Sequence, residues 1–81
     1  MNLIHFVKNR KGQINGAVVA IGRGQVGFSL CMDTDMHKFT KARAVEIAIQ
    51  RATIYHESLK VPHSIRRVFE SVVERSNRYF K

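Results

Sequence analysis

The side chains best suited to chemistry lie in one short stretch in the middle of the chain. Cys31 precedes His37 by a few residues, and a thiol with a nearby imidazole is the pairing that a nucleophilic enzyme uses. Cys31, however, falls on an expected apolar strand, where a cysteine is structural rather than reactive. The few carboxylates fall mostly on expected exposed helix faces, so no acid and base pair is evident. The sequence therefore predicts no catalytic residue and a protein that is not an enzyme.

The same stretch contains side chains that bind metals in other proteins. Asp33, Asp35 and His37 alternate oxygen and nitrogen ligands, but no fourth ligand accompanies them on this expected turn. Turn formation and helix capping are the roles that these residue types favour here. Either Asp35 caps a helix that begins near residue 36, or Thr40 caps a helix that begins near residue 41. We expect neither a metal site nor a cofactor.

Basic residues are in large excess over the whole chain. The 81 residues include 14 Lys and Arg against 6 Asp and Glu, which gives a formal charge of +8. Such an excess in a short chain favours polyanionic partners or phosphorylated ligands. No acidic residue precedes Asp33, whereas both expected hairpin turns carry basic side chains. The candidates for contact with nucleic-acid phosphates are Lys8, Arg10, Lys11, Arg23, Arg66 and Arg67.

Three apolar segments in the first half of the chain predict a three-stranded antiparallel meander. They cover residues 3–7, 14–21 and 25–32 and are separated by glycine-containing turns. The middle segment is apolar on both faces, as expected for a central strand. The second turn, 22–24, has neither a Walker pattern nor a dinucleotide fingerprint, so we interpret it as a hairpin turn and not as a phosphate loop.

Helical periodicity dominates the second half of the chain. It extends over residues 41–59 and, after Pro62, over residues 63–79. We therefore expect one domain, 1–81, with an α+β fold in β-β-β-α-α order and both helices packed on one face of the sheet. Arg51 falls on the flank of the apolar side of the first helix. It needs a carboxylate partner or an anionic ligand there, and both alternatives stay open.

Cysteine content and length indicate the compartment and the assembly. The single cysteine excludes an intramolecular disulfide and favours the cytoplasm. The first residues do not have the pattern of a secretory signal, and no window approaches the roughly 18 to 20 apolar residues that span a bilayer. A chain of this size buries a modest fraction of its surface. We therefore expect a homo-oligomer, which would supply the missing burial, and no membrane partner.

The segment 14–52 contains a recognisable set of features: a strand that ends in Ser29-Leu30-Cys31, an aspartate at Asp35, then Phe39, Lys41, Ile47-Ala48 and Arg51-Ala52. This set resembles a pattern found in small bacteriophage proteins, including the Thoeris anti-defence sponge family. The resemblance implies an α+β protein that sequesters a cyclic ADP-ribose-type immune signal without chemistry. It also implies that Phe39 stacks on a base and that Lys41, Arg43 and Arg51 hold phosphates, roles that suit their chemistry.

These observations together predict a small, non-enzymatic, phage-type protein of the host cytoplasm that binds a phosphate-bearing ligand. Sequestration of a cyclic nucleotide is the form of binding that the resemblance favours. One alternative is a basic nucleic-acid-binding protein, whose affinity would depend strongly on salt. Another alternative is an inhibitor that docks on an acidic host protein through the same positive surface.

Overall fold

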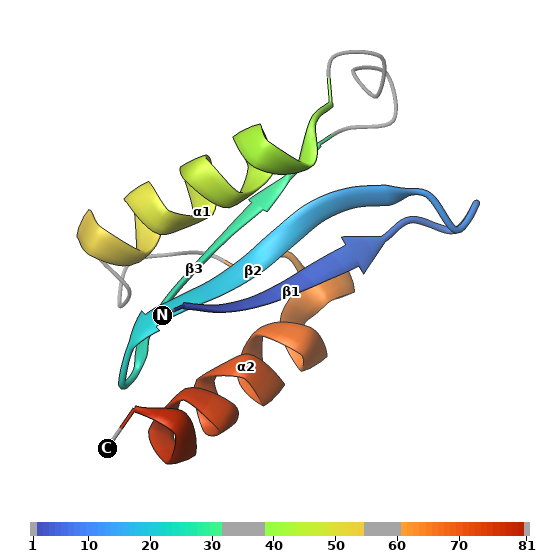
Figure 1. Ribbon diagram of the computed structural model, residues 1–81. Coiled ribbons are helices and arrows are strands. Elements are labelled where there is room, and N and C mark those ends of the chain that lie inside the picture. The colour runs from blue at the N-terminus through green and yellow to red at the C-terminus, as the bar shows by residue number, and fades with distance from the viewer. Residues whose placement is uncertain (1, 32–38, 55–60, 81) are drawn as a thin grey trace.

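A computed structural model describes residues 2–31, 39–54 and 61–80, and it has the predicted order of elements (Figure 1). The strands β1 (Leu3–Lys8), β2 (Ile14–Gly22) and β3 (Gln25–Leu30) form an antiparallel meander with β2 in the centre. They are followed by α1 (Lys41–Ile54), a short 3₁₀ helix (His63–Ile65) and α2 (Arg66–Tyr79). The α+β fold in β-β-β-α-α order is thus confirmed. None of the described helices combines the length and the apolar character that crossing a membrane requires.

Both strand connections are tight turns that carry basic side chains. In the β1–β2 turn the Oδ1 atom of Asn9 accepts hydrogen bonds from the backbone N–H groups of Lys11, at 2.9 Å, and Gln13, at 3.0 Å. Gly12 follows with a φ of 80°, and in the β2–β3 turn Gly24 has a φ of 72°. Glycine adopts this left-handed backbone at little cost, which explains its place in each turn.

The two helices cover opposite faces of the sheet, so the expectation that both pack on one face was wrong. Val19 of β2 belongs to a buried cluster that includes Ala44 and Ala48 of α1. Its neighbour Val18 points to the other side, into a separate cluster that includes Val72 of α2. Figure 1 shows the resulting order of layers, with the sheet between α1 and α2. A central strand that is apolar on both faces requires cover on both faces, which is the physical reason for this arrangement.

The backbone of α1 approaches β3 closely because the facing residues are small. A Cβ atom added at Gly27 would meet the carbonyl oxygen of Ala48 and the backbone nitrogen of Ala52. Both alanines are fully buried. At its start, α1 is capped by Thr40, whose Oγ1 accepts the N–H of Arg43 at 3.1 Å. This confirms one of the two expected caps, whereas the other, Asp35, lies outside the described residues, as does the end of the expected helix at 55–59.

A buried serine joins α2 to the far end of the sheet. The Oγ atom of Ser76 accepts the N–H of Gly24 at 3.1 Å and donates to the carbonyl of Val73 at 2.6 Å. Ser76 is completely inaccessible to solvent. The last turns of α2 are therefore fixed against the β2–β3 turn, and the first turn of α2 lies near the opposite end of the sheet.

Candidate functional site

The residues predicted from the resemblance to hold a nucleotide lie on or beside α1, where each contacts another part of the protein. Phe39 is partly buried against the core cluster under α1. The Nζ atom of Lys41 lies 5.6 Å from the centroid of the Phe6 ring, in a cation–π arrangement. Arg43 forms an ion pair with Glu46, with 2.9 Å between Nη1 and Oε1. None of the four residues lines any of the pockets described below.

Arg51, the fourth member of this set, has a partner that the sequence analysis did not consider. Its Nη1 atom donates to the backbone carbonyl of Phe28 at 2.9 Å, and its guanidinium carbon lies 5.4 Å from the centroid of the Phe28 ring. Phe28 belongs to β3, an edge strand, and edge strands have backbone groups without a strand partner. Arg51 supplies a donor to one of them. Lys41 and Arg51 are also ten residues apart on α1, about 15 Å along its axis.

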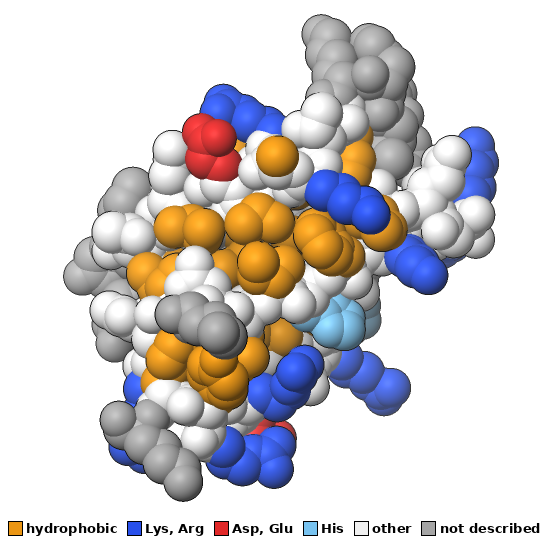
Figure 2. Space-filling view, viewed as in Figure 1, with side chains coloured by type: hydrophobic (Ala, Val, Ile, Leu, Met, Phe, Trp, Pro, Cys, Tyr) orange, Lys and Arg blue, Asp and Glu red, His pale blue; other side chains and the backbone are white. Residues whose placement is uncertain are grey.

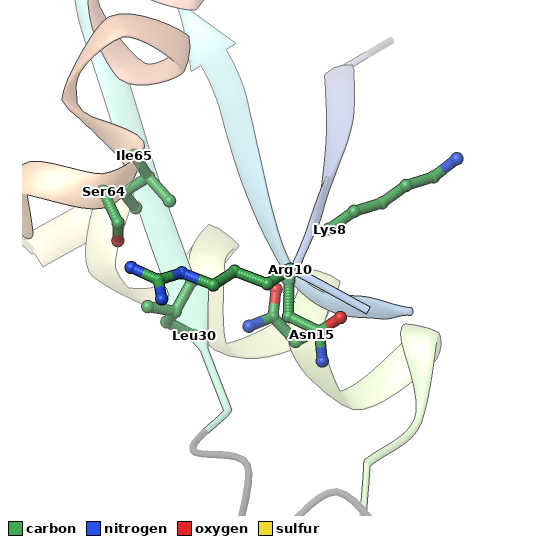
Figure 3. Close-up of a pocket in the computed structure, with 7 residues that line it drawn as sticks. Lys8, Arg10, Asn15, Leu30, Ser64 and Ile65 are labelled. Carbon is green, nitrogen blue, oxygen red and sulfur yellow. The ribbon is translucent and has the colours of Figure 1, made fainter. Parts of the chain in front are cut away.

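A pocket of about 440 Å³ lies instead between the β1–β2 turn and the beginning of α2. Figure 3 shows Arg10 crossing the pocket beside Leu30 with its guanidinium directed toward Ser64, while Lys8 extends away on the other side. The described residues that line this pocket are Lys8, Asn9, Arg10, Asn15, Leu30, Ser64 and Ile65. None of them is acidic, so the pocket offers mainly hydrogen-bond donors and positive charge.

A second pocket, of about 520 Å³, adjoins the first at Ser64. Its described lining residues come from the 3₁₀ helix and the first turn and a half of α2: His63, Ser64, Arg66, Arg67 and Glu70. We refer to the two pockets together as the basic cleft. Glu70 is the single acidic residue among the described residues that line it.

The basic cleft collects four of the six residues predicted to contact nucleic-acid phosphates. These are Lys8, Arg10, Arg66 and Arg67. Within the described part of the chain, ion pairs join Arg43 to Glu46 and Arg78 to Glu74, and none involves these four. Lys11 belongs to the same turn as Arg10. Arg23 lies in the other turn, next to Gly24, and is therefore separated from the cleft by much of the length of α2.

The helical segment that borders the cleft increases its positive potential. The first amide N–H groups of a helix lack intrahelical partners and carry a partial positive charge. No acidic residue occurs in the first turn of the 3₁₀ helix or of α2, and neither N-cap makes a side-chain hydrogen bond. The helix dipole and the cleft arginines therefore both raise the positive potential of the cleft.

Ser64 and Asn15 are among the polar residues of the cleft that the sequence analysis missed. Ser64 and Asn15 are distant in the sequence and meet only because α2 packs back on the sheet. Ser64 follows Pro62 at the start of a predicted helix, and this was the signal that could have marked it. Asn15 gave no such signal. Its Oδ1 atom is buried and accepts no hydrogen bond from the described residues.

The side chains of the cleft are suited to binding phosphate. Ammonium, guanidinium and hydroxyl groups donate hydrogen bonds to phosphate oxygens. Cys31, partly buried beyond the end of β3, is not among the lining residues, and its expected partner His37 lies outside the described residues, as do Asp33 and Asp35. Over the described parts of the chain, no three His, Cys, Asp or Glu side chains gather closely enough to hold a metal ion.

Comparison with known proteins finds no matching family model, no similar curated protein and no similar solved structure. The resemblance to phage sponge proteins therefore stays a prediction. The geometry and charge of the basic cleft are the grounds on which a function can be proposed.

Proposed function

We propose that this protein binds a phosphate-bearing ligand in the basic cleft and carries out no chemistry on it. The observation that carries the proposal is that two distant basic segments line two pockets that share Ser64. Lys8 ends β1 and Arg10 lies in the β1–β2 turn, whereas Arg66 and Arg67 come from the start of α2. Positive charges without an acidic partner beside a pocket raise the local potential and favour an anion there.

The energetics support an anionic ligand, such as a phosphate, more than a neutral one. Hydrogen bonds to charged groups contribute about 1.5–3 kcal/mol each, and a guanidinium binds two phosphate oxygens at once. The start of a helix stabilises the same charge. Each of the two pockets falls within the range of about 300–1,000 Å³ that is typical of ligand sites. A phosphate with part of its attached group fits this combination of size and charge.

Sequestration of a cyclic nucleotide in a phage-infected cell is one form of this proposal. It keeps the ligand class expected from the resemblance but moves the phosphate contacts from α1 to the basic cleft. The reason for the move is that Lys41, Arg43 and Arg51 each have a contact within the protein. A homo-oligomer in the host cytoplasm remains our expectation for the form in which the protein acts.

Titration calorimetry with inorganic pyrophosphate tests the proposal. We expect saturable binding, and we expect Arg10→Ala to raise the Kd about tenfold, which corresponds to roughly 1.4 kcal/mol. Arg23→Ala is the matched control, because it removes the same charge from the other hairpin turn and should leave the Kd within about twofold. Equal losses in the two variants would mean that only the net charge matters, and the proposed site would then be wrong.

A further inference from the structure

A third pocket lies at the opposite end of α2 from the basic cleft. This pocket, of about 310 Å³, is lined by Leu3, Arg75, Arg78 and Tyr79. Leu3 begins β1 and Lys8 ends it, while Ser64 precedes α2 and Tyr79 ends it. The two elements therefore run in opposite directions with a pocket at each end. We refer to the surface between these pockets as the β1–α2 seam.

The seam has a positive charge at both ends and exposed polar groups between them. Ser71, Arg75 and Arg78 follow spacings of four and three residues, which place them on one flank of α2. His5, exposed, lies on the side of β1 that faces α2, between Leu3 and Val7. In Figure 2 the Lys and Arg surfaces gather over α2, and a histidine surface lies between them and the sheet.

The third pocket differs from the basic cleft because it has an aromatic ring. Tyr79 is 46% exposed, an unusual fraction for a large side chain in this protein. Its ring is held edge-to-face against Phe80, with 5.0 Å between the centroids. Arg75 makes no ion pair with the described residues, and Arg78 approaches Glu74 only at 3.8 Å with both side chains exposed. A positioned ring beside two arginines is a platform on which a nucleobase stacks.

The length of the seam indicates a polymer and not a mononucleotide. Ser64 and Tyr79 are fifteen residues apart, about 22 Å along a helix. At the 3.4 Å spacing of a stacked strand, this distance corresponds to about six nucleotides. A single nucleotide cannot contact both ends. A duplex keeps its bases stacked on one another, so its bases are not available to a ring at one end of a groove, whereas a single strand offers phosphates and bases together.

We propose that the β1–α2 seam binds single-stranded nucleic acid, with phosphates at Lys8 and Arg10 and a base stacked on Tyr79. This inference rests on the proposed function, because the same cleft supplies one end of the site. It adds a polymer as the ligand and assigns a binding role to Tyr79 and Arg75. Recognition is through the backbone and base faces, so the site tolerates any sequence.

Fluorescence anisotropy with a labelled ten-nucleotide oligodeoxythymidine tests the inference. We expect Tyr79→Ala to raise the Kd about 5- to 100-fold, the range of a lost base–aromatic stack. Tyr79→Phe keeps the ring and should stay within about twofold of the unchanged protein. On a strand of equal length without bases, Tyr79→Ala should have no effect. A hairpin duplex of equal charge should bind at least tenfold more weakly than the single strand.

The variants separate the failure of this inference from the failure of the proposed function. If Arg10→Ala weakens binding of the oligonucleotide and of pyrophosphate while Tyr79→Ala changes neither, the cleft binds phosphate and the seam proposal is wrong. If Tyr79→Ala weakens the baseless strand equally, the effect is not stacking and the seam proposal is again wrong. If Arg10→Ala changes neither Kd, the proposed function itself fails. Thermal unfolding of each variant shows whether a loss reflects misfolding.

Discussion

At the scale of single residues, the roles of the arginines are decided by their neighbours and not by their position in the sequence. Arg51 and Arg10 are both exposed basic side chains. Arg51 donates to a carbonyl of an edge strand and stacks on Phe28, so it contributes to the fold. Arg10 lies across a pocket without an ion-pair partner in the described part of the chain. A basic residue with no internal partner is the one available to a ligand.

This difference predicts separate effects for the two arginines. Arg51→Ala removes a hydrogen bond and a cation–π contact, and we expect the free energy of unfolding to fall by about 1 kcal/mol in urea denaturation. The Kd for pyrophosphate should be unchanged, because Arg51 does not line the cleft. A variant with normal stability and a much weaker Kd would instead place the ligand on α1, where the resemblance predicts it.

At the scale of elements, small residues determine how closely α1 approaches the sheet. Gly27 of β3 faces the backbone of α1 at Ala48 and Ala52, and neither side has room for another carbon atom. The helix therefore contacts the strand through backbone atoms over part of its length. Small residues at a buried interface allow this approach, and the interface tolerates little enlargement.

Gly27→Ala is expected to lower the free energy of unfolding by about 1–3 kcal/mol, because overpacking displaces α1 from the sheet. Urea denaturation followed by circular dichroism measures the change. Gly12→Asn is the control, since Gly12 has open space around it and asparagine tolerates its positive φ. That variant should remain within about 0.5 kcal/mol of the unchanged protein. Equal stability of the two variants would contradict the close packing of α1.

The strands and helices could be predicted because the sequence patterns that specify them are local. The face of the sheet on which each helix packs was predicted less well. Apolar segments bounded by glycine-containing turns predicted the strands, Pro62 marked one helix start, and Thr40 was one of two caps considered for the other. The two-sided apolar pattern of β2 already indicated cover on both faces, but the similar apolar stripes of the helices suggested a common surface. The cleft forms where the turn that carries Arg10 and the 3₁₀ helix that carries Ser64 line the same pocket. No local sequence pattern connects two segments so far apart in the chain.

At the scale of the whole molecule, the charge is distributed unevenly over an elongated body of 38 × 23 × 21 Å. Among the described acidic residues, Glu46 and Glu74 are paired with arginines of their own helices. The β1–β2 turn and the flanks of α2 carry basic side chains without such partners in the described ranges. The positive potential is therefore concentrated over the turn and α2, and it attracts anions to the cleft before any contact forms.

The most direct test of the basic cleft is a titration of the isotope-labelled protein with inorganic pyrophosphate, followed by amide nuclear magnetic resonance. The largest shift changes should occur at residues 8–11 of the β1–β2 turn and 63–67 at the start of α2. Amides of α1, including those of Arg43 and Arg51, should move little. Changes centred on α1, or small changes spread evenly over all basic segments, would contradict a phosphate site between the turn and α2.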